Sequence, residues 1–125
     1  HVTAGNKLYR QIAQLNEHMT PTLNILDGWE AIVRGGPTAA GNPTGLVGEP
    51  GVMIVSTDRI AADVMGLAVL KRYAVDNEDI HNWSVWENPQ IVEAIAAGVG
   101  ISGPDEFDAA GPTADEFDDF MDLIV

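Results

Sequence analysis

The chain has 125 residues, of which 46% are hydrophobic and 20% are charged, a balance typical of one globular domain or part of a larger one. Its 19 acidic residues outnumber 6 basic ones, and the formal net charge of -13 makes nucleic acid and anionic membranes poor partners. The chain contains no cysteine, which excludes disulfides, thiolate metal sites and any iron–sulfur cluster bound by this chain alone.

The start of the chain leaves the localisation open. No run approaches the roughly 18–20 apolar residues of a membrane span, and no signal-peptide pattern is present. Because the chain begins with His1 rather than Met, we expect a processed or truncated piece. Such a piece is cytoplasmic, or exported if an upstream signal was removed.

Residues 7–19 predict an amphipathic helix, with Asn6 as its N-cap and a stop at Pro21. The apolar residues recur at helical spacing: Leu8, Ile12, Leu15 and Met19. Lys7 then falls in the first turn, where a cation opposes the helix macrodipole. It is either a solvated lysine or a residue kept there for function.

Two strands follow, joined by a long loop rich in glycine and proline. Residues 22–27 form the first strand, residues 28–50 the loop, and residues 51–56 the second strand. The continuous apolar run 52–55 is typical of a strand covered on both faces, as in parallel sheets.

A buried helix is predicted next, with Thr57 or Asp58 as its cap and an end near Arg72. It is apolar almost all round, except for Asp63 in its middle. A carboxylate buried there must be paired, metal-bound or protonated.

The last third of the chain predicts mainly helices. Residues 78–86 read as a short helix, and Asn88-Pro89 begins another that stops at Gly98 or Gly100. Residues 106–108 read as an edge strand, and residues 113–125 as a terminal helix. We therefore predict an α/β fold with a small, mainly parallel sheet flanked by helices, and we expect it to be part of a larger domain. Residues 1–110 form the α/β domain and residues 111–125 an acidic C-terminal helix.

The negative charge is concentrated at the C-terminal end. Residues 105–125 contain eight acids and no base, so they supply -8 of the total of -13. This segment is a solvated helix face, a docking surface for a basic partner, or an adaptation to salt.

Carboxylates at the strand ends predict a binding site. In parallel sheets, ligands bind beyond the carboxyl ends of the strands, where Asp27 and Asp58 would meet. With Asp63 they would bind a divalent metal, Mg or Ca, or a hydroxyl-rich ligand. Asp27, Asp58, Asp63 and Lys7 are the catalytic candidates. The alternative roles are a turn for Asp27, a cap for Asp58 and an ion pair with Arg59 for Asp63.

The glycine-rich loop supplies the candidate ligand-binding residues: Gly35, Gly36, Pro37, Gly41 and Pro43, together with Ser56. The loop lacks the Lys-Ser/Thr of a P-loop, so a phosphate would have to rely on backbone amides, with Arg34 nearby. The three histidines show no metal-ligand spacing.

Three segments together, LNILDGWEAIVRGGPTAAGNP, VMIVSTDRIAADVMG and IVEAIAAGVG, resemble the C-terminal half of the family known as domain of unknown function 362. The matching positions are Asp27, Gly36, Pro37, Gly41, Pro43, Ser56, Asp58, Ala61, Asp63 and Gly100. The chain departs from the family pattern around Asn6-Lys7, at Val64, and in its lack of the cysteine clusters that some members carry.

The resemblance implies a bacterial or archaeal protein, sometimes linked to iron–sulfur redox modules or exported by the twin-arginine route, and it implies no reaction. Two functions follow as hypotheses. The first is a domain with a carboxylate-lined small-molecule or divalent-metal site at the sheet edge. The alternative is a non-catalytic binding or redox-accessory module that docks a missing N-terminal half or a partner protein, or forms a homo-oligomer. Convergent carboxylates favour the first, and a flat, exposed apolar face favours the second.

Overall fold

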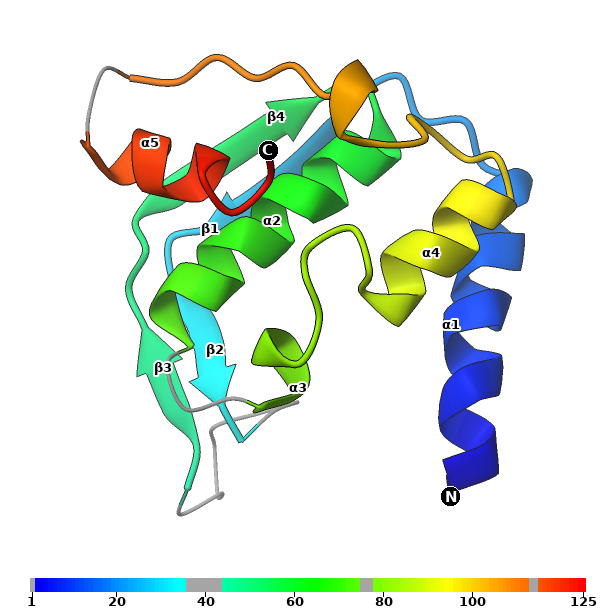
Figure 1. Ribbon diagram of the computed structural model, residues 1–125, viewed down its shortest axis with the longest axis horizontal. Coiled ribbons are helices and arrows are strands. Elements are labelled where there is room, and N and C mark those ends of the chain that lie inside the picture. The colour runs from blue at the N-terminus through cyan, green and yellow to red at the C-terminus, as the bar shows by residue number, and fades with distance from the viewer. Residues whose placement is uncertain (1, 36–43, 75–77, 113–114) are drawn as a thin grey trace.

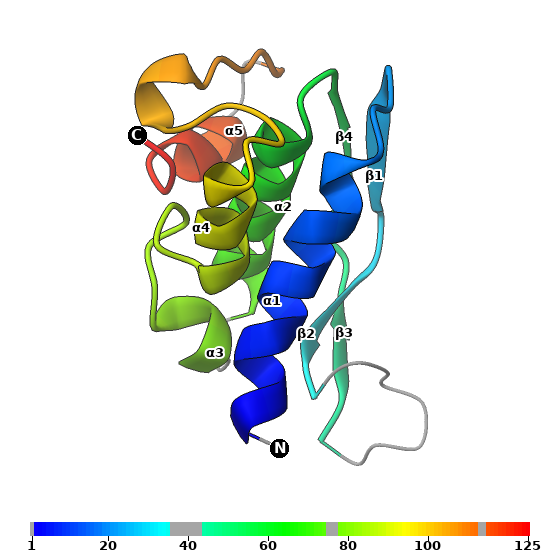
Figure 2. The same ribbon diagram turned by 90° about the vertical axis from the view of Figure 1, so that its right-hand side faces the viewer.

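The fold has two layers, with the strands on one side and the helices on the other (Figures 1 and 2). The structure is a computed structural model that describes residues 2–35, 44–74, 78–112 and 115–125, with the backbone alone for residues 2–7, 78 and 79. In chain order the elements are α1 Val2–Glu17, β1 Asn24–Gly28, β2 Ala31–Arg34, β3 Leu46–Gly48, β4 Val52–Ser56, α2 Arg59–Tyr73, α3 Glu78–His81, α4 Pro89–Ala96, η1 Pro104–Glu106 and α5 Asp115–Met121. A mixed fold of helices and small sheets was therefore correctly predicted.

The four strands form one long, bent antiparallel hairpin. β1 pairs with β4, and Asn24 lies opposite Ser56 at one end of this pair while Gly28 lies opposite Val52 at the other. Farther along, β2 pairs with β3 as a second two-stranded antiparallel sheet. The prediction of a mainly parallel sheet is wrong. Parallel neighbours need a crossover connection, whereas the segment after β1 turns back on itself and returns as β3 and β4.

The segment predicted as one irregular loop, residues 28–50, contains β2 and β3. Its glycines and prolines hid two short strands, because Ile32, Val33, Leu46 and Val47 are too few to show an alternating pattern. The Gly51 amide donates to the Trp29 carbonyl oxygen at 3.2 Å where the hairpin bends. Gly51 has a φ of 67°, a conformation that suits glycine better than any residue with a side chain.

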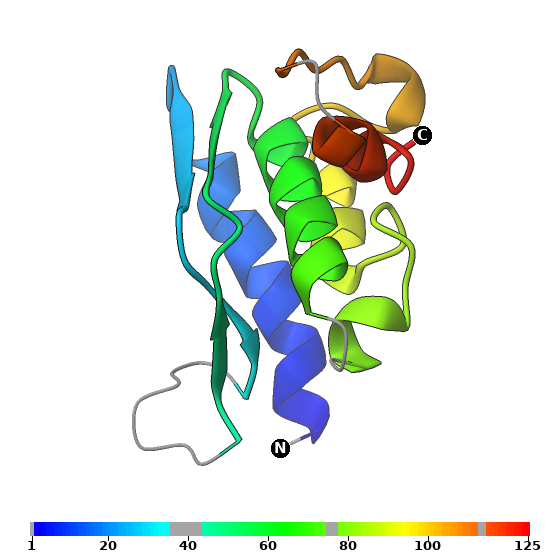
Figure 3. The same cartoon turned by 90° about the vertical axis from the view of Figure 1, so that its left-hand side faces the viewer.

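Only one face of the β1·β4 sheet is covered by helices (Figure 3). Alternate residues face α2, including Leu26 and Ile54, while the residues between them are exposed. Ile25, Met53 and Val55 are 59%, 71% and 57% exposed on the outer face. The expectation that the apolar run 52–55 is covered on both faces is therefore wrong, because none of the described helices covers the outer face of this sheet.

Helix α2 is the centre of the molecule, as its all-round apolar sequence predicts. It packs against both strands of the β1·β4 sheet on one side and against α3, α4 and α5 on the others. Its buried residues are Ile60, Ala62, Val64, Met65, Ala68 and Val69. Together with Val85, Ile91 and Val99 they form the core, which Phe120 and Ile124 of the C-terminal segment complete.

The predicted N-terminal helix is present, but it begins at Val2, so Asn6 and Lys7 lie within it. Asn6 is therefore not the N-cap of this helix, and Lys7 does not lie in its first turn. α1 packs against α4 (Figure 2). Among the described side chains of α1, Ala13 is buried, whereas Leu8 and Leu15 are 54% and 66% exposed. The apolar stripe that the sequence predicts is therefore largely uncovered.

The structure confirms the predicted starts of α2 and α4, but not the predicted C-terminal edge strand. Asp58 caps α2, and Asn88 caps α4 with Pro89 in the first turn, as predicted. The edge strand predicted at residues 106–108 is wrong. Residues 104–106 form the turn η1 instead, because Pro104 fits a first helical position and the Glu106 carboxylate accepts a hydrogen bond from the Ser102 amide at 2.8 Å.

Candidate functional site

Asp27 lies on the outer face of the sheet, away from the helices. The strand alternates, so Leu26 faces α2 and Asp27 is exposed. The Asp27 carboxylate accepts a hydrogen bond from the Trp29 amide at 2.9 Å, which stabilises the turn after β1. This is the turn role that the sequence analysis gave as the alternative.

Asp58 lies at the opposite end of the β1·β4 sheet from Asp27. Asp27 pairs with Met53, while Ser56, two residues before Asp58, pairs with Asn24. The prediction that Asp27 and Asp58 converge at one edge is therefore wrong, because it required parallel strands.

The Asp58 carboxylate joins the start of α2 to the segment that follows α4. One oxygen accepts a hydrogen bond from the Ala61 amide at 2.8 Å, and the other accepts one from the Ile101 amide at 3.0 Å. A Cβ atom at Gly100 would lie 2.7 Å from both carboxylate oxygens, so this approach requires glycine. Both Asp58 and Gly100 belong to the resemblance motif, and the geometry gives them a shared structural role.

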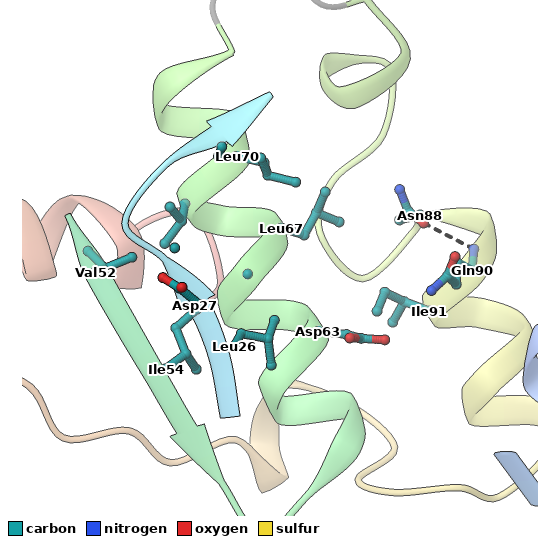
Figure 4. A pocket seen from close by; sticks show the side chains of 14 residues that line it. Leu26, Asp27, Val52, Ile54, Asp63, Leu67, Leu70, Asn88, Gln90 and Ile91 are labelled. Carbon is teal, nitrogen blue, oxygen red and sulfur yellow. Dashed lines mark hydrogen bonds between the residues drawn. The ribbon is translucent and has the colours of Figure 1, made fainter. Parts of the chain in front are cut away.

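Asp63 lines a cavity of about 360 Å³ between the inner face of the β1·β4 sheet, α2 and the start of α4. Figure 4 shows its carboxylate directed toward Gln90, while the Asp27 carboxylate points to the other side of the strand. The Gln90 side chain lies beside the Asp63 carboxylate and favours its charged form. Asp27 and Asp63 both line this cavity, but their carboxylates point in different directions.

The surroundings of Asp63 raise its pKa. Desolvation by the protein around it disfavours the charged form, and the neighbouring Gln90 amide opposes this only in part. Asp63 is nevertheless exposed, so the expectation of a buried carboxylate is wrong. The helix turns Asp63 toward α4 rather than into the core.

Arg59 is committed to α1 rather than to Asp63. Its guanidinium donates hydrogen bonds to the carbonyl oxygens of Asn16 and Met19, the latter at 2.5 Å. A cation at this position also stabilises the C-terminal end of the α1 macrodipole. The alternative in which Arg59 pairs with Asp63 therefore does not hold.

The remaining candidates are scattered or undescribed. Gly36, Pro37, Gly41, Pro43 and the side chain of Lys7 lie outside the described residues. Gly35 follows β2 with a φ of 73°. Ser56 ends β4, and its hydroxyl accepts a hydrogen bond from the Asp58 amide at 3.0 Å.

No group of three or more His, Cys, Asp or Glu side chains that could hold a metal ion occurs among the residues that the structure describes. Asp27, Asp58 and Asp63 each have a different neighbourhood, so they do not form the metal site that the parallel arrangement predicted. Mg and Ca need several oxygen ligands around one point, which these three carboxylates do not supply.

Sequence reasoning missed Asn88 and Gln90 as site residues. Asn88 was assigned only the helix cap, which it provides by accepting a hydrogen bond from the Gln90 amide at 3.0 Å. Gln90 was assigned no role. Their proximity to Asp63 depends on how α4 packs on α2, and local sequence carries no signal for that packing.

A second hollow follows β4. It has a volume of about 620 Å³ and is lined by residues 50–56 on one side and residues 107–112 on the other. Phe117 and Glu116 of α5 close one end. Glu116 accepts a hydrogen bond from the Tyr73 hydroxyl, and this bond raises the pKa of Tyr73. Asp119 forms an ion pair with Arg72 at 3.1 Å. These two contacts join α5 to α2.

Comparison with known proteins identifies a family but no close relative. The model of a family described as a domain of unknown function, DUF362, matches residues 1–68. Neither the curated proteins nor the solved structures include a match to the chain. Among the described helices, none has both the length and the apolar character required to cross a membrane.

Proposed function

Because the chain belongs to the family of domains of unknown function DUF362, whose description names no reaction, we propose a function from its surface. It is a non-catalytic docking module that binds an extended, basic segment of a partner protein along the free edge of β4. The observation that carries this proposal is the groove of about 620 Å³ beside that strand.

The groove runs along the strand rather than across it. Seven consecutive residues, 50–56, line one wall. Side chains of a strand alternate between the two faces of a sheet, so an unbroken run of lining residues indicates a hollow at the strand edge. Residues 107–112 form the opposite wall, and Ala61, Met65 and Val69 of α2 also line the groove. We expect one extended chain to fit between the two walls.

The edge of β4 offers backbone groups for pairing. Among the described strands β4 has one neighbour, β1. On the other edge, alternate amides and carbonyls point away from β1, as in any edge strand. An extended peptide that adds to such an edge gains main-chain hydrogen bonds and places alternate side chains in the groove.

The charge of the groove selects the partner. Asp108 and Glu116 line it, and none of the described residues lining it is Lys, Arg or His. The net charge of -13 adds a long-range attraction for cations. The segment that fits is an extended run in which apolar residues alternate with Lys or Arg.

A second copy of this chain fits poorly. Its own β4 region, residues 50–56, contains no charged residue and would leave Asp108 and Glu116 uncompensated. Two chains of charge -13 also repel each other. The exposed outer face of the sheet, with Ile25, Met53 and Val55, extends the apolar surface that a partner would cover.

The test is a titration with a capped seven-residue peptide of alternating Val and Lys, followed by the amide shifts of β4. We expect saturable shifts along residues 52–56, and no binding of the matching Val-Glu peptide. Asp108→Lys should weaken binding at least about five-fold, whereas Asp105→Lys, the same charge change outside the groove, should weaken it less than about two-fold. Equal effects of the two variants would contradict the proposal. So would equal binding of both peptides, or a dimer in light scattering that forms through β4.

A further inference from the structure

We propose that the cavity beside Asp63 is a binding site for a small organic cation, a primary amine with a compact apolar body. The inference goes beyond the docking function, because the cavity lies between the inner face of the sheet, α2 and α4, whereas the groove follows the free edge of β4. The two hollows share Val52, Ile54 and Val69 as lining residues. It rests on the shape of the cavity, on its lining and on the one carboxylate that faces it.

The cavity has a size suited to a small ligand. Its volume is about 360 Å³, within the range of roughly 300–1,000 Å³ typical of ligand pockets. Three elements that are far apart in the sequence form it: the inner face of the β1·β4 sheet, the middle of α2 and the start of α4 (Figure 4). Because these elements also form the core, the pocket is held in shape without a ligand.

Most of the wall is apolar. Leu26 and Ile54 project from the sheet, Leu67 and Leu70 from α2, and Ile91 from α4. Gly66 lies between them, and a Cβ atom there would come within 3.0 Å of the Leu26 side chain, so glycine keeps the floor of the pocket open. This wall accommodates a compact hydrocarbon body but offers it no hydrogen bonds.

The polar groups lie together at one side. Figure 4 shows Asp63, Gln90 and Asn88 around the same end of the cavity, with Asp63 on α2 and the two amides on α4. The side-chain oxygen of Asn88 already accepts a hydrogen bond from the Gln90 backbone amide at 3.0 Å. The Gln90 side chain lies beside Asp63, whose two carboxylate oxygens offer more acceptor positions than one amide can fill.

The charge of this end determines the class of ligand. None of the described residues lining the cavity is Lys, Arg or His, and Arg59, one helical turn before Asp63, donates instead to carbonyl oxygens at the end of α1. A carboxylate or phosphate ligand would be repelled, and a neutral ligand would leave the carboxylate without a counter-charge. An ammonium group supplies three donors and a positive charge, and in a partly desolvated site such charge-assisted bonds are the strong ones.

A neighbouring hollow, which also borders Asp63, gives the ligand room to extend. It has a volume of about 750 Å³ and shares Leu26, Asp63 and Gln90 with the first cavity. Asn16 and Asn24 add amide groups there. Arg59 also lines this hollow, but its guanidinium is held by the carbonyl oxygens at the end of α1.

The chain contains a matched control for this site. Asp105 of η1 is exposed and lines neither this cavity nor the hollow beside it. Asp63→Asn and Asp105→Asn therefore remove the same charge by the same substitution, but only the first alters the cavity.

The experiment is an NMR titration of the whole chain with cyclohexylamine, with cyclohexanecarboxylate as the ligand of opposite charge. For so small a ligand we expect a dissociation constant of roughly 1 mM. Shifts should appear at the Gln90 side-chain amide and at the amides of Gly66 and Leu67, and cyclohexanecarboxylate should cause none. Asp63→Asn should weaken binding at least about ten-fold and Asp105→Asn less than about two-fold.

Three results would overturn the inference. One is the absence of shifts at about 10 mM cyclohexylamine, roughly ten times the expected dissociation constant. Another is an equal loss in both variants, which would mean that the amine responds only to net charge. The third is retention of binding by Asp63→Asn together with a normal circular dichroism spectrum. Because Asn has nearly the shape of Asp and Asp63 is exposed, this variant should fold.

Discussion

The carboxylate of Asp58 should be one of the largest single contributions to stability in this chain. It accepts hydrogen bonds from the Ala61 amide at 2.8 Å and from the Ile101 amide at 3.0 Å. Loss of an N-cap costs about 1 kcal/mol, within a range of roughly 0.5–2. A partly buried amide left without a partner costs about 1–3 kcal/mol more. Asp58→Ala should therefore lower the free energy of unfolding by about 2–4 kcal/mol.

The two bonds can be separated by a second substitution. Ser in place of Asp58 retains a capping oxygen for the Ala61 amide but lacks the second oxygen that Ile101 uses. We expect Asp58→Ser to lose about half as much stability as Asp58→Ala. In both variants the Ile101 amide should exchange with solvent faster, since its hydrogen bond is gone.

The assay is urea unfolding followed by circular dichroism, with amide hydrogen exchange as the local readout. Asp122→Ala, which removes an exposed acid from the C-terminal segment, is the matched control and should change the free energy of unfolding by less than about 0.5 kcal/mol. The reasoning is refuted if Asp58→Ala behaves like this control. It is also refuted if the Ile101 amide is as protected in Asp58→Ser as in the unmodified chain.

Three further predictions follow from the same contacts. Gly100→Ala should lower the free energy of unfolding in urea by about 1–3 kcal/mol, because the added Cβ would lie 2.7 Å from both Asp58 oxygens. Gly103→Ala is the control and should be harmless, because no atom lies within 4 Å of a Cβ there. Equal effects of the two variants would be evidence against this contact. Arg59→Ala should cost about 1–3 kcal/mol and speed amide exchange in α1, and unchanged exchange there would contradict the contact. The pKa of Asp63 in the folded chain lies above its ordinary value of 3.8, so the folded state binds the Asp63 proton more tightly than the unfolded state does. The stabilisation by this proton is fully present below pH 3.8 and is lost as the pH rises through the folded-state pKa. Stability relative to Asp63→Asn should therefore fall from pH 4 to pH 7, and a constant difference would exclude the raised pKa.

The local signals of the sequence predicted much of the secondary structure. α2 follows from its apolar run and its Asp58 cap, and α4 from Asn88-Pro89. β1 and β4 follow from short apolar runs that end at polar residues. β2 and β3 were missed because three or four residues among glycines and prolines show no period.

The candidate site was predicted only in its residue types. Asp63 does line a cavity, and Asp58 does hold a defined position, but the two do not meet. The predicted convergence with Asp27 depended on parallel strands, and the direction of a neighbouring strand is not encoded in the strand itself. Asn88 and Gln90 join Asp63 only because α4 packs beside the middle of α2.

By itself the sequence determined the order of the main elements, the central burial of α2, the excess of negative charge and membership of the family. These properties depend on composition, short periods and caps, which act within a few residues. Only the tertiary structure decided that the strands are antiparallel, that one face of the sheet is uncovered, and which carboxylate faces a cavity. Strand pairing and helix packing join residues far apart in the chain, so the surfaces that can bind a partner or a ligand arise when the elements assemble.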